Sequence, residues 1–134
     1  MKILFICKYN RFRSQIADNY FRKINKNKNI KSSSAGIIIG IPVADSVKAI
    51  AKKLGFSVNG KPKGIQEKLL KEIDMLVIVA NNVPPSLFKN ITKKVVVWKI
   101  PDTTQENYKA IEQISREIMK KVDNLNKKLK NMRK

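Results

Sequence analysis

The segment Ile3-Leu4-Phe5-Ile6-Cys7-Lys8-Tyr9-Asn10-Arg11-Phe12-Arg13-Ser14 decides the fold of this 134-residue chain. Its first four residues form a short apolar run, which is typical of a strand buried inside a sheet. Helical spacing of apolar residues starts just beyond it, so the polar residues in between form a strand-to-helix loop. A thiol therefore lies where the strand ends, and an arginine and a serine lie where the helix begins.

The rest of the chain continues this alternation of strand and helix. Beyond the first strand at 2–6, strands are predicted at 30–34, 75–80 and 94–98. Helices are predicted at 14–25, 42–54, 65–72 and from about 104 to near the end, with a helical turn at 84–89. This order predicts a single domain over 1–134 with a three-layer α/β/α architecture around a four-stranded parallel sheet. Ligands of such sheets bind beyond the carboxyl ends of the strands, where Cys7 lies.

The last helix carries an apolar stripe that continues to Met132. We expect its first half to pack on the sheet. The basic end, residues 120–134, has two interpretations. It overhangs the domain, which is the interpretation we favour, or it meets a partner chain and supports self-association.

The loop after Cys7 has the composition of an anion-binding site. Backbone N–H groups of residues 8–14 and the start of the following helix can point at one anion, and they favour the thiolate form of Cys7. Arg13 supplies a planar fork for two oxygens of a phosphoryl group or of arsenate. Ser14 can donate a hydrogen bond to the sulfur, and Asn10 tolerates the left-handed backbone that a reversing loop needs. The competing interpretation is that Cys7 is merely a small buried apolar residue.

The composition excludes several kinds of chemistry. With one cysteine and no histidine, the chain has no intramolecular disulfide, no four-cysteine zinc site and no histidine-based acid–base catalysis. We expect neither a metal nor a cofactor. No apolar run approaches the roughly 18 residues of a membrane span, and the run after Lys2 is too short for a signal peptide. A single thiol suits a reducing compartment, so we expect a cytoplasmic protein.

The pattern Cys7-x5-Arg13-Ser14 after a strand, followed by the helix from Gln15, resembles the opening of the low-molecular-weight protein tyrosine phosphatases. Thiol-coupled arsenate reductases share their fold. The resemblance continues in order through the chain, at residues 32–36, 51–56, 74–79 and 98–102.

This resemblance implies a phosphomonoester hydrolase that forms a cysteinyl-phosphate on Cys7. Its implied substrate is a phosphotyrosine-like group on a phosphoprotein or a phosphorylated small molecule. Arg13 and the phosphate-binding loop, residues Lys8, Tyr9, Asn10, Arg11, Phe12, Arg13 and Ser14, would bind the phosphoryl oxygens. Asp102 corresponds to the general acid of the family, which later acts as a base. Ser34 would support the loop by a hydrogen bond to Asn10.

The chain also departs from the family pattern, and the departures keep alternatives open. The aromatic walls of the substrate slot are replaced by Ile37-Ile38-Ile39 and by the segment after Asp102, and Phe12 replaces a frequent second cysteine. A single-cysteine arsenate reductase resolved by an external thiol is therefore the alternative. Asp102 itself has a competing interpretation as a helix N-cap, a role for which Thr103 and Thr104 are rivals.

The net charge of +19 raises a further alternative, a catalytically silent protein that binds anions or nucleic acid. The lysines are spread along the chain and no nucleic-acid-binding motif accompanies them, so we do not favour a nucleic-acid partner. The same positive field would attract any anionic substrate.

Overall fold

The computed structural model describes residues 1–91 and 94–131. Within these residues the strands are β1 (Lys2–Cys7), β2 (Lys31–Gly36), β3 (Met75–Val79) and β4 (Val95–Trp98). The helices are α1 (Arg13–Ile24), α2 (Asp45–Lys53), α3 (Glu67–Glu72) and α4 (Tyr108–Asn131), and a 3-10 turn, η1, covers Pro85–Phe88. Each predicted strand and helix is present, several with shifted ends.

The described strands form one parallel sheet in the order β2-β1-β3-β4. The central strands β1 and β3 are buried from Ile3 to Cys7 and along the whole of β3, whereas the edge strand β4 is largely part-exposed. Continuous apolar runs are required where helices cover both faces of a parallel sheet. The predicted three-layer α/β fold is confirmed.

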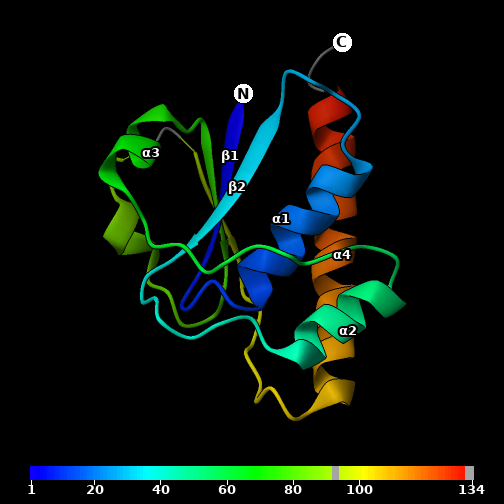
Figure 1. Cartoon of the computed structure of the whole chain (residues 1–134). Coiled ribbons are helices and arrows are strands. Elements are labelled where there is room, and N and C mark those ends of the chain that lie inside the picture. The colour runs from blue at the N-terminus through cyan, green and yellow to red at the C-terminus, as the bar shows by residue number, and fades with distance from the viewer. Residues whose placement is uncertain (92–93, 132–134) are drawn as a thin grey trace.

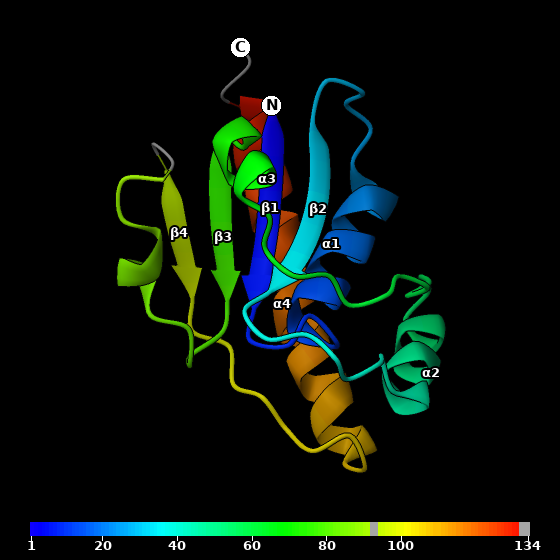
Figure 2. The same ribbon diagram turned by 60° about the vertical axis from the view of Figure 1, so that its left-hand side comes forward.

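Helices α1, α2 and α4 lie on one side of the sheet, and α3 and η1 lie on the other (Figures 1 and 2). Side chains alternate between these layers along β1. Ile3 and Phe5 join the larger apolar cluster under α1 and α4, whereas Leu4 and Ile6 join the smaller cluster beside α3. All strand arrows in Figure 2 point the same way, which brings the loops that follow the strands to one edge.

Two helices begin later than the sequence predicts. Helix α2 begins at Asp45 instead of Pro42, because the preceding Ala44 is still extended, with ψ at 151°. Helix α4 begins at Tyr108 instead of about Thr104. The side chain of Asn107 accepts the N–H of Ala110 at 3.1 Å, which is the hydrogen bond of an N-cap. The segment before Asn107 stays irregular and carries Asp102.

The apolar stripe of α4 remains buried as far as Leu129. Val122, Leu125 and Leu129 belong to the larger cluster, and burying such a side chain contributes about 1.5–3 kcal/mol. As far as Leu129, the helix end therefore packs on the domain, whereas Lys130 and Asn131 are exposed. Residues 132–134, including Met132 of the predicted stripe, lie outside the described residues.

A partly buried hydrogen bond joins α1 to α4, the two helices that lie side by side in Figure 1. The hydroxyl of Tyr20 donates to Oδ1 of Asp123 at 2.8 Å, and its ring packs on Phe56 with centroids 5.5 Å apart. Partial burial and the neighbouring carboxylate raise the pKa of Tyr20 from 10.0 to about 12.

We expect Tyr20→Phe to lower the free energy of unfolding by about 1 kcal/mol at neutral pH, because a hydrogen bond to a charged acceptor is lost. Since folding raises the pKa of Tyr20, this stabilisation is complete below pH 10.0 and is lost as the pH rises through about 12. Denaturant titrations of both proteins across this range measure the difference. Tyr108→Phe, which changes an exposed side chain, is the control. Equal losses in the two variants would contradict the role of this hydrogen bond.

Candidate active site

The loop between β1 and α1 closes tightly over the end of β2. Asn10 adopts the left-handed conformation that the sequence predicts, with φ at 51°. Gly36, which pairs with Cys7 in the sheet, lies directly beneath. A Cβ atom on Gly36 would lie 2.7 Å from the backbone nitrogen of Asn10, so no larger residue fits without moving the loop.

The Cys7 sulfur is in contact with both the side chain and the backbone N–H of Ser14. The Sγ atom lies 2.9 Å from Oγ of Ser14, and the backbone N–H of Ser14 points at it from 3.4 Å. Asn10 Nδ2 donates to the same Oγ at 2.7 Å. Because Oγ accepts from Asn10, its own hydrogen is free to donate to the sulfur. The hydroxyl and the backbone N–H of Ser14 can therefore both donate to the sulfur.

Helix α1 adds its N-terminus to the same point. Phe12 occupies the N-cap position without a side-chain hydrogen bond, and the first turn contains no acidic residue. The N-terminal N–H groups and the positive end of the helix dipole are therefore not neutralised by a side-chain cap. The Phe12 side chain is 2 % exposed and belongs to the larger apolar cluster, so it anchors the loop to the core.

Arg13, the first residue of α1, carries a buried charge, with 1 % of its side chain exposed. Its Nη1 donates to the carbonyl of Ile100 at 2.9 Å, and its Nη2 donates to Oδ1 of Asn82 at 3.0 Å. A buried charge is costly unless such partners hold it. A guanidinium has five N–H donors, so these two contacts leave donors for the oxygens of an anion.

Asp102 lies at the same guanidinium. Its Oδ2 is 3.5 Å from Nη2 of Arg13, and its Oδ1 accepts the backbone N–H of Thr103 at 2.9 Å. Its side chain is 29 % exposed, so it can reach solvent and a ligand. Because α4 begins six residues later and Asn107 is its N-cap, neither Asp102 nor its rivals Thr103 and Thr104 caps that helix.

Asn10 is braced from a different direction than the sequence predicts. Its Oδ1 accepts the backbone N–H of Lys63 at 2.8 Å and lies 3.3 Å from Nε2 of Gln15. The expected hydrogen bond from Ser34 is absent, because Oγ of Ser34 is buried with no partner among the described residues. Ser14 takes the Asn10 amide instead, so this part of the prediction is wrong.

Two supporting residues were missed by the sequence analysis. Gln15 is 1 % exposed and its Nε2 lies within hydrogen-bonding distance of the Asn10 carbonyl (3.2 Å) and the Lys61 carbonyl (3.4 Å), which joins the loop to residues 61–63. Asn82 holds Arg13 from the loop after β3. The position of Asn82 directly beyond a buried strand of a parallel sheet was the available signal for it.

The remaining loop side chains and the expected slot walls reach the surface. Lys8, Tyr9 and Arg11 are partly exposed. The chain after β2 runs alongside, since the N–H of Ile38 donates to the Lys8 carbonyl at 2.9 Å. Ile37, Ile38 and Ile39 are 39, 50 and 56 % exposed, so this side of the site is aliphatic where the family pattern has aromatic residues.

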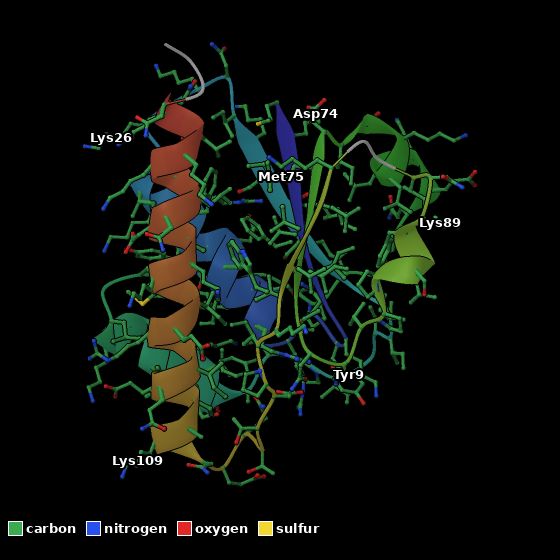
Figure 3. The ribbon with its side chains drawn as sticks, turned by 180° about the vertical axis from the view of Figure 1, so that it is seen from behind. Tyr9, Lys26, Asp74, Met75, Lys89 and Lys109 are labelled. Carbon is green, nitrogen blue, oxygen red and sulfur yellow. The ribbon has the colours of Figure 1, made fainter. Side chains whose placement is uncertain are left out.

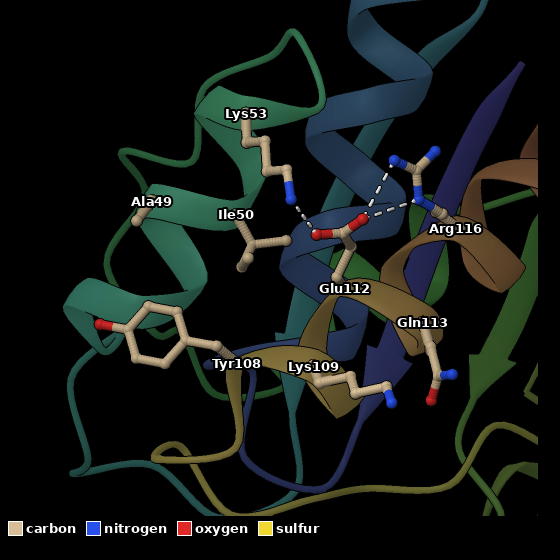
Figure 4. Close-up of a pocket in the computed structure, with 8 residues that line it drawn as sticks. All are labelled: Ala49, Ile50, Lys53, Tyr108, Lys109, Glu112, Gln113 and Arg116. Carbon is tan, nitrogen blue, oxygen red and sulfur yellow. Dashed lines mark hydrogen bonds and ion pairs between the residues drawn. The ribbon is translucent and has the colours of Figure 1, made fainter.

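A separate hollow lies between α2 and α4 (Figure 4). Glu112 crosses it, 2.6 Å from Nζ of Lys53 and 3.1 Å from Nη2 of Arg116. Hydrogen bonds from these two cations lower the pKa of Glu112. No residue of the loop from Cys7 to Ser14 lines this hollow, so we assign it no part in the site.

Other kinds of site find no support in the described part of the chain. Residues 1–91 and 94–131 contain no group of three or more His, Cys, Asp or Glu side chains placed to hold a metal ion. The helices in the same residues are all too short or too polar to cross a membrane.

The site thus contains a thiol on a strand-to-helix loop, a buried arginine six residues later and a carboxyl beside that arginine. The sequence matches the model of one family over residues 2–134, described as low molecular weight phosphotyrosine protein phosphatase. The chain belongs to this family, which confirms the resemblance. No curated protein sequence matches the chain.

Solved structures of three proteins are similar to the whole fold. The YwlE arginine phosphatase from Geobacillus stearothermophilus is 16 % identical with a TM-score of 0.86, covering 98 % of this chain and 94 % of that one. The low molecular weight protein tyrosine phosphatase from T. tengcongensis is 23 % identical with a TM-score of 0.80, covering 96 % and 99 %. An arsenate reductase from Archaeoglobus fulgidus is 26 % identical with a TM-score of 0.76, covering 92 % and 98 %.

We expect Asn82→Ala to weaken the binding of inorganic phosphate by about three- to tenfold, because Arg13 loses an acceptor that orients its guanidinium. Isothermal titration calorimetry measures the affinity. Asn81→Ala is the matched control, since Asn81 contacts the same loop through its backbone N–H, which donates to the Ile100 carbonyl at 2.9 Å. Equal phosphate affinities in the two variants would remove Asn82 from the site.

Proposed function

We propose that this protein hydrolyses phosphomonoesters through a cysteinyl-phosphate intermediate on Cys7. The observation that carries the proposal is the convergence of three groups. Ser14 contacts the sulfur of Cys7 at one end of the loop. Arg13 stands at the other end, and its Nη2 lies 3.5 Å from Oδ2 of Asp102. Nucleophile, oxyanion receptor and proton donor are the parts that this reaction requires.

In the first step, Sγ of Cys7 attacks phosphorus while the ester P–O bond breaks. Arg13 and the loop N–H groups bind the non-bridging oxygens, whose charge is held throughout the transfer. The departing oxygen takes a proton from the carboxylic acid of Asp102. The chain has no histidine, and Asp102 is the carboxyl that faces Arg13.

In the second step, water attacks the phosphorus of the cysteinyl-phosphate and the P–S bond breaks. The carboxylate of Asp102 now takes a proton from that water, reversing its role. The thiolate of Cys7 leaves with the hydroxyl hydrogen bond of Ser14, which stabilises it as a leaving group. Asn10 keeps Ser14 in this orientation.

The second candidate function is reduction of arsenate. A single buried thiol and the likeness to an arsenate reductase at 26 % identity favour it. Cys7 would attack arsenic and displace water, and an external thiol would then attack Sγ. Arsenic(V) would gain two electrons and leave as arsenite, while Cys7 forms a mixed disulfide that a second thiol reduces. A silent anion-binding protein, with neither activity, is the remaining candidate.

The test is an aryl-phosphate assay of the wild-type protein, Cys7→Ser and Asp102→Asn, with and without EDTA. We expect turnover that EDTA does not change. Cys7→Ser should abolish it, because no thiolate remains to attack, and Asp102→Asn should lower kcat by about 10²–10³-fold, because the leaving group is no longer protonated. Glu106→Gln, which removes an exposed carboxylate from the same segment, is the control.

Parallel reactions separate the candidates. Phosphotyrosine, phosphoarginine and arsenate with glutaredoxin or a small thiol are supplied to the same preparation. Arsenite release without phosphate release would replace the hydrolase with the reductase. If the wild type turned over none of the compounds but bound phosphate, the silent anion-binding protein would be the correct description.

A further inference from the structure

Two cations of the loop lie against one aromatic ring. Nζ of Lys8 is 5.4 Å from the ring centroid of Tyr9, and Cζ of Arg11 is 5.9 Å from the same centroid. Both distances are within the range of a cation–π interaction. The Tyr9 ring is therefore in contact with two cations of the same loop.

Neither cation has an acidic partner in the part of the chain that the structure describes. The ion pairs among residues 1–91 and 94–131 involve other lysines and arginines, and the carboxyl of Asp102 pairs with Arg13. In addition, Nε of Arg11 is buried and has no hydrogen-bond acceptor among the described residues. A buried donor without an acceptor is unfavourable, and an anion at this position would satisfy it.

The residues of the loop from Cys7 to Ser14 fall into a buried set and a partly exposed set, which we call the rim. Asn10, Phe12, Arg13 and Ser14 are buried and form the phosphoryl cradle with Cys7, whereas Lys8, Tyr9 and Arg11 are partly exposed. Tyr9 lies at the edge of the sheet where the strands end (Figure 3). A phosphoryl group bound in the cradle would direct its leaving group out past this rim.

We propose that Lys8 and Arg11, oriented by Tyr9, form a second anion subsite, which binds a negatively charged group on the leaving-group side of the substrate. This inference rests on the proposed function. The subsite takes a carboxylate or a second phosphate, and it opposes leaving groups that carry a positive charge, such as the guanidinium of phosphoarginine. The preference arises because two unpaired cations attract a second anion and repel a cation.

Three aryl phosphates that differ in one remote charge test this subsite. They are para-(carboxymethyl)phenyl, para-methylphenyl and para-(aminomethyl)phenyl phosphate, whose remote groups are negative, neutral and positive. In the two charged compounds, the ring and a methylene separate the charge from the reacting oxygen. We expect kcat/KM to fall in that order, with the carboxymethyl compound about three- to tenfold better than the methyl compound, as expected for a solvent-exposed charge contact. Raising the NaCl concentration to about 0.5 M should reduce the differences in kcat/KM between the three compounds, because salt screens exposed charges.

Variants of Lys8 and Arg11 test whether these two residues cause the charge preference. Arg11→Gln and Lys8→Gln should each lower the ratio of kcat/KM between the carboxymethyl and methyl compounds towards one, whatever they do to the absolute rates. Lys26→Ala is the matched control, because Lys26 is exposed and lies at the opposite end of the molecule from Tyr9 (Figure 3). An unchanged ratio in both loop variants, or no charge order in the wild type, would overturn the subsite while leaving the hydrolase intact.

Binding supplies a readout that does not need turnover. Calorimetric titration of Cys7→Ser with the same three compounds should give Kd values in the same order, and Arg11→Gln in that background should remove the difference. If the wild type proved inactive, this order would still support the subsite. Equal affinities for all three compounds would reject it, independently of the fate of the proposed hydrolase.

Discussion

The buried charge of Arg13 is the constraint on which the site depends. A guanidinium that is 1 % exposed must be given acceptors by the protein, because water cannot supply them. Those acceptors come from Ile100 and Asp102 after β4 and from Asn82 after β3. They can reach Arg13 because the sheet order places β3 beside β1 and β4 beside β3. The loop from Cys7 to Ser14 is thus oriented by residues from the whole edge of the sheet.

The parts of the fold that follow from local pattern were predictable from the sequence. Apolar runs and helical periodicity place the strands and helices, since each reports a face that must be buried. The core of the site was predictable for the same reason, because Cys7, Asn10, Arg13 and Ser14 lie within eight consecutive residues. The left-handed conformation of Asn10 follows from the chemistry of asparagine in a reversing loop.

The remaining features depend on partners distant in the sequence. Asn82 contacts Arg13 across 69 positions of the sequence, and Lys63 contacts Asn10 across 53. The apolar periodicity of the sequence predicts neither contact. Asparagine is common in exposed loops, so its side chain identifies a contact only once the sheet order is known. The predicted start of α4 was too early because several residues with cap chemistry follow one another, and the one that accepts the cap hydrogen bond is Asn107. The end of α4 was taken to overhang because its lysines are conspicuous, although the stripe beneath them is buried.

The electrostatics of the loop link its stability to its chemistry. Lys8, Arg11 and Arg13 lie within six residues, and Asp102 pairs with Arg13 alone among them. Their mutual repulsion disfavours the folded loop, and a bound anion relieves it. An anion that binds only the folded chain stabilises it by RT ln(1 + [L]/Kd), so affinity and stability rise together. Additional carboxylates would stabilise the loop on its own but would compete with the phosphoryl oxygens for Arg13. Among the described residues, Asp102 is the one carboxylate in an ion pair with Arg13, which leaves guanidinium donors for the oxygens of the proposed substrate.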